Sequence, residues 1–259
     1  MSGVHWRLFI DSPASGAENM ARDHALMERA AASGEWMLRV YAWRAPTVSL
    51  GRNQTARGLY DLERIRARGI GVVRRPTGGR AILHDREITY SVTAPTEAAG
   101  DLHASYERIN RLLVHALRGL GVDARIAAPT SRAASPGLAP CFDEPAAGEL
   151  TVNGRKLAGS AQWRAGGALL QHGSILIADD QSLLNQLTIT ERPPIPTPAT
   201  LGEALGRAPE FREIAGALTE AVRQLEDPAA EPFTADEGFR ARTSALVVRY
   251  MDDAWTWRR

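Results

Sequence analysis

Apolar and polar positions alternate over short stretches of this chain, as in β-strands that bury one face. Between these stretches, apolar residues recur every three or four positions, as on the buried face of a helix. We therefore predict helices over residues 17–32, 59–68 and 106–120, and strands over residues 5–10, 37–41, 47–50, 71–74, 81–83, 88–93 and 168–177. Interleaved helices and strands of this kind predict a mixed α/β or α+β fold.

Turn-forming residues mark the ends of several of these segments. Gly34 follows the first predicted helix, where a glycine suits the C-terminal cap. Asn153-Gly154 suits a type I′ turn, so residues 150–152 and the segment after the turn are predicted to form a β-hairpin. Residues 129–140 are rich in Ser, Ala, Pro and Gly, which predicts a loop.

A cluster of prolines predicts where the chain divides. Residues 193–198 contain four prolines, which excludes the interior of a helix or strand. We expect a main catalytic domain over residues 1–192. The remainder, residues 193–259, is predicted to be a C-terminal helical part packed on the same domain.

Composition narrows the class of protein. The chain has 259 residues, of which 44% are hydrophobic and 24% charged, as in globular proteins with a substantial core. A formal net charge of +1 argues against a nucleic-acid partner. A single cysteine excludes an intramolecular disulfide framework and fits a reducing compartment. No apolar run reaches the length of about 18 residues expected of a membrane span, and the first residues have no signal-peptide pattern. We therefore expect a cytoplasmic protein with no membrane partner.

The only cysteine and the only lysine of the chain, Cys141 and Lys156, lie close in sequence. All other strongly basic positions are arginine, so this lysine indicates a task that a planar guanidinium cannot perform. Cys141 lies between Pro140 and Pro145, which predicts an accessible loop. A nearby ammonium would favour the thiolate, the nucleophilic form of the thiol. The alternatives are an inert buried thiol and a surface lysine without function.

A glycine-rich turn is the most distinctive part of the chain. Gly78 and Gly79 follow a predicted strand, so the backbone there can approach a ligand closely and present N–H groups to an oxyanion or a thioester carbonyl. Arg75 and Arg80 flank the turn, where they could hold a phosphate or carboxylate. An ordinary hairpin turn with solvated arginines is the alternative.

Signatures of several other chemistries are missing from the sequence. No P-loop, Gly-x-Gly-x-x-Gly or Gly-x-Ser-x-Gly motif occurs, so nucleotide-cofactor and serine-hydrolase functions lack support. His84 suits a structural role about as well as a catalytic one. The histidines show no metal-binding spacing with Cys141, so we expect no metal.

These motifs together resemble those of the lipoate–protein ligase and octanoyltransferase superfamily. Members of that superfamily attach lipoyl or octanoyl groups to the lysine of a lipoyl domain. The resemblance implies an α+β fold, with a mixed β-sheet wrapped by helices as in the catalytic domains of biotin–protein and lipoate–protein ligases. It extends from about residue 5 to residue 257, and it is carried by Asn19-Met20, residues 49–54, 74–92 and 154–177, and the ending from Arg249-Tyr250 to Trp255.

Three branches of this superfamily differ in the order of their motifs. Lipoate ligases use ATP, need no cysteine and show Gly-Gly-Gly followed by His-Asp-x-Gly-Asn. Here Arg80 stands at the third glycine and Glu87-Ile88 at the Gly-Asn pair. The common octanoyltransferases carry their lysine before their cysteine. The cysteine–lysine octanoyltransferases have the cysteine loop first, then Gly-Arg-Lys and Gly-Ser-Ala-Gln, and this chain resembles them.

The resemblance implies a role for each matching residue. Cys141 would form the acyl-thioester, while Lys156 would lower the pKa of its thiol and contact the developing oxyanion. The residues implied to bind the acyl group or substrate are Arg75, Thr77, Gly78, Gly79, Arg80, His84, Gly159 and Ser160.

The same resemblance implies the substrates. The donor would be octanoyl-acyl carrier protein, and the acceptor a lipoyl-domain protein such as glycine cleavage H protein or the acyltransferase subunit of a 2-oxoacid dehydrogenase. Transfer from a thioester to an amide is downhill, so we expect no cofactor and no ATP. The alternatives are an ATP-dependent lipoate–protein ligase, an octanoyl amidotransferase acting between lipoyl domains, and a non-catalytic lipoyl-domain binder.

Overall fold

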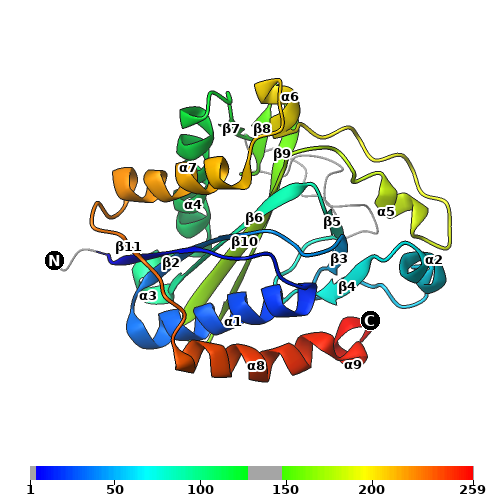
Figure 1. Ribbon diagram of the computed structural model, residues 1–259, viewed down its shortest axis with the longest axis horizontal. Coiled ribbons are helices and arrows are strands. Elements are labelled where there is room, and N and C mark those ends of the chain that lie inside the picture. Colours follow the sequence, from blue (N-terminus) through cyan, green and yellow to red (C-terminus); the bar gives the residue numbers. More distant parts are fainter. Residues whose placement is uncertain (1–3, 128–147, 259) are drawn as a thin grey trace.

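A mixed β-sheet of eight strands forms the centre of the molecule, with helices on both of its faces (Figure 1). The computed structural model describes residues 4–127 and 148–258. The strand order is β11-β1-β2-β6-β10-β9-β8-β7, in which β1 is parallel to β2 and β11 and the other pairs are antiparallel. These strands are β1 (Trp6–Ile10), β2 (Trp36–Tyr41), β6 (Glu87–Pro95), β7 (Arg125–Ile126), β8 (Leu150–Val152), β9 (Arg155–Ala165), β10 (Ala168–Leu176) and β11 (Glu231–Pro232).

Two helix pairs cover the sheet. On one face, α4 (Leu102–Gly119) and α7 (Phe211–Leu225) enclose the largest hydrophobic core with the central strands. On the other face, α1 (Gly16–Ser33) packs against α8 (Glu237–Met251) (Figure 1). Ser15 and Glu18 form a capping box at the start of α1, and Gly34 ends it in the left-handed conformation at φ 76°.

A second, three-stranded sheet lies beside the first and has the order β4-β3-β5. It consists of β3 (Thr47–Leu50), β4 (Gly71–Arg74) and β5 (Ile82–His84), and it packs with α2 (Leu62–Ala67) around a separate core. Because β4 and β5 both pair with β3, the segment between them, which contains Gly78 and Gly79, is held at the edge of this sheet.

Most predicted segments agree with the observed ones, and the α+β prediction is confirmed. The hairpin of β8 and β9 turns at Asn153 and Gly154, both at positive φ as a type I′ turn requires. The predicted starts of two helices, at residues 59 and 106, are wrong. These helices begin at Leu62 and Leu102, directly after the capping residues Asp61 and Asp101, because the cap and not the apolar pattern sets the first turn.

The chain after residue 193 is not only helical. Its two-residue strand β11 joins the main sheet by pairing with β1, and α8 packs on α1. The division at residue 193 stays a prediction. The remaining short helices are α3 (Thr96–Ala99), α5 (Leu183–Gln186), α6 (Leu201–Leu205) and α9 (Asp253–Thr256). Within residues 4–127 and 148–258, no helix is long and apolar enough to cross a membrane.

Candidate active site

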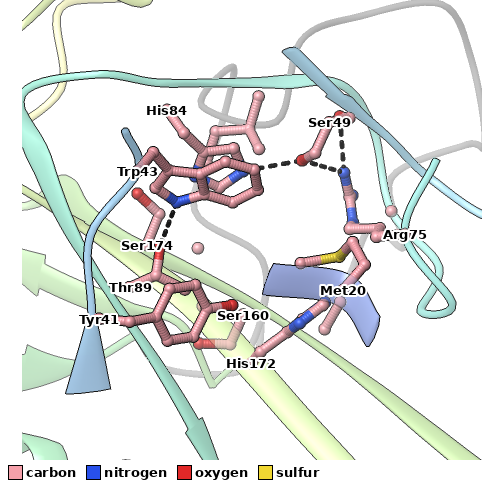
Figure 2. A pocket seen from close by; sticks show the side chains of 15 residues that line it. Met20, Tyr41, Trp43, Ser49, Arg75, His84, Thr89, Ser160, His172 and Ser174 are labelled. Atoms are coloured by element: carbon pink, nitrogen blue, oxygen red, sulfur yellow. Dashed lines mark hydrogen bonds between the residues drawn. The ribbon is translucent and has the colours of Figure 1, made fainter. Parts of the chain in front are cut away.

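A pocket with an empty volume of about 430 Å³ lies between the two sheets and α1 (Figure 2). Both sheets contribute, so the site forms only when the three-stranded sheet packs against the main one. The pocket is lined by Met20, Tyr41, Trp43, Ser49, Arg75, Gly79, Ile82, His84, Thr89, Gly159, Ser160, Ala161, His172, Gly173 and Ser174.

The structure brings together most of the residues expected to bind substrate. The pocket lining includes five of them, namely Arg75, Gly79, His84, Gly159 and Ser160. The other three, Thr77, Gly78 and Arg80, lie in the same turn, and each contacts a lining residue through its hydroxyl or carbonyl group. Their roles in binding substrate stay predictions.

The guanidinium of Arg75 holds the glycine turn in shape. Its Nη1 donates to the carbonyl of Ser49 at 2.8 Å, and its Nη2 donates to the carbonyls of Gly78 at 2.9 Å and Arg80 at 2.7 Å. Gly79 has φ of 90°, and a Cβ there would lie 2.7 Å from Arg75 Nη2. Glycine is therefore required at position 79. The sequence predicts that Arg75 binds a phosphate or carboxylate. In the structure its guanidinium donates to backbone carbonyls of its own turn.

His84 is fixed within the pocket by stacking and hydrogen bonding. The Trp43 ring stacks on it at 4.0 Å, and its Nε2 lies 2.8 Å from Ser49 Oγ, which also accepts from Arg75 (Figure 2). Its Nδ1 lies 3.4 Å from Glu87 Oε1. Burial lowers the pKa of His84 even though Glu87 acts in the opposite direction, which keeps the ring neutral near pH 7.

This buried histidine should make the protein less stable in mild acid. The unfolded state gains a proton on His84 below pH about 6.5, whereas the folded state takes it up only at lower pH. The contribution of neutral His84 to the free energy of unfolding is therefore fully present above pH about 6.5. It falls as the pH drops toward the lowered pKa of the folded state. Urea unfolding between pH 7.5 and 5.5 should show a decline of up to about 1.4 kcal/mol per pH unit from this residue.

The His84→Asn variant should lose the part of the acid-induced fall in unfolding free energy that comes from His84. His24, whose pKa burial also lowers, should retain its own contribution. His103 is exposed on α4, so His103→Gln serves as the control and should keep the slope of the unaltered protein. An unchanged slope in His84→Asn would contradict this assignment.

A buried network beneath the pocket connects α1 to the glycine turn. His172 Nδ1 lies 3.0 Å from Asp23 Oδ2, and His172 Nε2 lies 2.7 Å from Thr77 Oγ1. Burial opposes ionisation of Asp23, but Arg39 at 2.7 Å and hydrogen bonds from His172 and Ser91 outweigh it and lower the pKa of Asp23. An ionised carboxylate only accepts hydrogen bonds, so His172 Nδ1 carries the proton. This chain of contacts positions Thr77 and therefore the turn.

Gly173 allows β9 and β10 to approach closely at the pocket wall. A Cβ at this position would lie 2.6 Å from the carbonyl oxygen of Gly159 and 2.7 Å from Ser160 Oγ. Ser160 Oγ in turn lies 2.7 Å from the Tyr90 hydroxyl. Burial raises the pKa of Tyr90 to about 12, so the hydroxyl stays protonated.

Lys156 is buried at the start of β9, where it is paired with a carboxylate. Lys156 is only 4% exposed, and its Nζ donates to Glu149 Oε1 at 2.6 Å. A register shift between β8 and β9 at Leu150 and Thr151 accompanies this pairing. Lys156 does not line the pocket, and it precedes Gly159 by three residues, about 10 Å along the strand. Cys141 lies outside the described residues, so its proximity to Lys156 stays a prediction.

Sequence reasoning missed several residues of the site. Trp43, Thr89 and Ser174 line the pocket, while Asp23, Glu149 and His172 make the buried ion pairs and hydrogen bonds. Asp23 lies one helical turn after Asn19, which is the only local signal for it. Among the residues with described positions, no cluster of three or more potential metal ligands occurs.

Known proteins resemble this chain along its whole length. Residues 15–223 match the model of the lipoyl protein ligase A/B catalytic domain. Octanoyltransferase LipM of Kyrpidia tusciae is 41% identical, with 98% of this chain and 99% of the relative covered. Octanoyltransferase LipM of Moorella thermoacetica is 37% identical, with all of both chains covered.

Two solved structures share the fold at lower sequence identity. Lipoate-protein ligase A bound with ATP superposes with a TM-score of 0.81 at 22% identity, covering 98% of this chain and 99% of the other. A structure from the analysis of a bipartite lipoate protein ligase and its E2 lipoyl domain from Thermoplasma acidophilum gives a TM-score of 0.77 at 21% identity, covering 98% of this chain and 96% of the other. At this level of identity the likeness concerns the fold alone.

Proposed function

The chain belongs to the lipoyl protein ligase A/B catalytic-domain family, and from this membership we propose that it is an octanoyltransferase of protein lipoylation that works through a cysteine acyl-thioester. The observation that carries the proposal is the full-length similarity to LipM octanoyltransferases. The order of Cys141 before Gly154-Arg155-Lys156 supports the same branch. A pocket with Met20, Trp43 and Ile82 in its lining suits an acyl chain.

The reaction would proceed in two acyl transfers. In the first, the Cys141 thiolate attacks the thioester carbonyl of the donor, a new carbon–sulfur bond forms, the donor's carbon–sulfur bond breaks, and the donor leaves as its thiolate. In the second, the neutral amine of the acceptor lysine attacks the octanoyl-cysteine, an amide bond forms, and the Cys141 thiolate is released. The amine proton passes to solvent or to a nearby base. The Lys156 ammonium would stabilise the thiolate and the developing oxyanion.

The partners follow from this chemistry. Octanoyl-acyl carrier protein is the donor, and a lipoyl domain, such as that of H protein or of a 2-oxoacid dehydrogenase acyltransferase subunit, is the acceptor. A single free thiol fits a reducing compartment, so the cytoplasm is the proposed location of the reaction. The Gly78–Gly79 turn, held by Arg75 and Thr77, would supply backbone donors beside the acyl group.

Octanoyl transfer should need no ATP, because the donor thioester already carries the activated acyl group. Purified enzyme, octanoyl-acyl carrier protein and unmodified H protein should give octanoylated H protein in nucleotide-free buffer, as measured by intact mass. Free octanoate with ATP and magnesium should give none. A requirement for ATP would instead identify a ligase.

The amidotransferase alternative is tested in the same assay. Octanoylated H protein replaces the carrier-protein donor, and a second lipoyl domain serves as the acceptor. Faster transfer from octanoylated H protein than from octanoyl-acyl carrier protein would make the chain an amidotransferase.

A further inference from the structure

A groove with a positively charged rim lies on the α4 and α7 face of the molecule, outside the pocket described above. It has an empty volume of about 870 Å³ and runs between α4, the C-terminal end of α7 and β7. The groove contains Val114 and Ile126 as apolar lining, and Leu225 is 48% exposed beside them.

Three arginines form the rim of this groove. Arg111 and Arg118 lie seven residues apart on α4, so two helical turns place them on the same face. Arg125 lies opposite on β7. Arg111 has no ion pair or hydrogen bond with the described part of the chain. Arg118 donates to the Ala124 carbonyl at 3.1 Å, and the nearby Asp123 carboxylate offsets part of its charge.

The third arginine is partly neutralised, because Arg125 pairs with the exposed carboxylate of Asp123 at 2.8 Å. His115, the remaining polar residue of the lining, shares a hydrogen bond of 2.7 Å with Gln224. Among the described residues, these three arginines face one carboxylate, that of Asp123, so the groove keeps a net positive rim around an apolar centre.

The strand register places this groove near Lys156. Arg125 on β7 is opposite Thr151 on β8, and Thr151 is opposite Lys156 on β9. With neighbouring strands about 4.8 Å apart, the backbones of Arg125 and Lys156 are separated by about 10 Å. A substrate protein in the groove would thus lie beside the reaction centre without filling it.

We propose that this groove docks the acyl carrier protein donor, through an acidic amphipathic helix whose carboxylates face Arg111 and Arg118. The proposal rests on the octanoyltransferase function. An apolar floor with a charged rim suits a helix bound in a groove, and the arginine charges would steer an acidic partner. The carrier protein presents its thioester on a long flexible arm, so it can dock away from the reacting atoms. An acceptor lysine has only four methylene groups, so its protein must bind at the mouth of the site.

The test uses the full chain with Arg111→Glu, alone and combined with Arg118→Ala. Initial rates are measured with octanoyl-acyl carrier protein and with octanoyl-pantetheine, a thioester donor that lacks the protein. For the carrier-protein donor, we expect KM to rise about tenfold or more with kcat little changed, and its dependence on salt to weaken. With octanoyl-pantetheine, KM should change less than twofold.

Arg212→Glu is the matched control. Arg212 is an exposed arginine at the opposite end of α7, about 20 Å from Leu225 along the helix. The KM of the Arg212→Glu variant for octanoyl-acyl carrier protein should equal that of the unaltered enzyme.

Three results would overturn the docking proposal. These are an unchanged KM for the carrier-protein donor, an equal loss with both donors, and a rise in KM for the lipoyl-domain acceptor instead. In each of these, the unaltered enzyme still transfers octanoyl, so the proposed function stands. If the unaltered enzyme transfers octanoyl from neither donor, the proposed function fails and the docking proposal fails with it.

Discussion

Replacing Cys141 with serine should lower octanoyl transfer by about a thousandfold or more, because a serine hydroxyl at neutral pH is a far weaker nucleophile than a thiolate. Incubation of the unaltered enzyme with octanoyl-acyl carrier protein should add the mass of one octanoyl group. Hydroxylamine should remove that mass, as expected for a thioester. Cys141→Ser should show no such adduct.

The single cysteine of the chain makes this experiment decisive. A hydroxylamine-labile thioester in Cys141→Ser would contradict the assignment, since no other thiol exists to carry it. Full activity of the same variant with free octanoate and ATP would favour the ATP-dependent ligase, which needs no cysteine. The melting temperature of both proteins should be compared, so that a loss of activity is not a loss of folding.

Replacing Lys156 should have the second largest effect, and the structure separates its two consequences. Lys156→Ala should abolish most transfer and raise the pKa of the Cys141 thiol toward the free value of about 8.5. It should also destabilise the protein by about 3–5 kcal/mol, because the Glu149 carboxylate, in a residue 7% exposed, would lose its buried ion pair with this ammonium. Urea unfolding and the pH profile of iodoacetamide alkylation measure the two effects.

The double variant Lys156→Ala/Glu149→Gln is the control for stability. With the carboxylate removed as well, most of the lost stability should return, while transfer should stay low. If activity recovered together with stability, the only role of Lys156 would be to offset the buried charge of Glu149.

Lys156→Arg tests geometry rather than charge. It should keep a low thiol pKa yet lose most transfer, because the planar guanidinium cannot replace a compact ammonium paired at 2.6 Å. An arginine variant with full activity would contradict the idea that this lysine persists because arginine cannot replace it.

Elements with a strong local signal could be predicted from the sequence. The strands over residues 47–50 and 71–74 were predicted with their observed ends, and the β8–β9 hairpin followed from Asn153-Gly154, since an Asn-Gly turn specifies its own geometry. The short strand β11 carries no such signal. Its residues Glu231 and Pro232 are exposed, and they become a strand only by pairing with Arg7 and Leu8 near the other end of the chain.

Composition and motif spacing are enough to single out the unusual residues: one cysteine, one lysine and a glycine pair flanked by arginines. They do not identify Asp23, Glu149 and His172, because aspartate, glutamate and histidine are ordinary residues whose importance depends on burial. His172 lies 149 residues from Asp23 in sequence, and the packing of α1 on β10 joins them. A buried carboxylate is costly unless a cation or donor offsets its charge, and the partner that comes within reach depends on how distant segments pack in the folded protein.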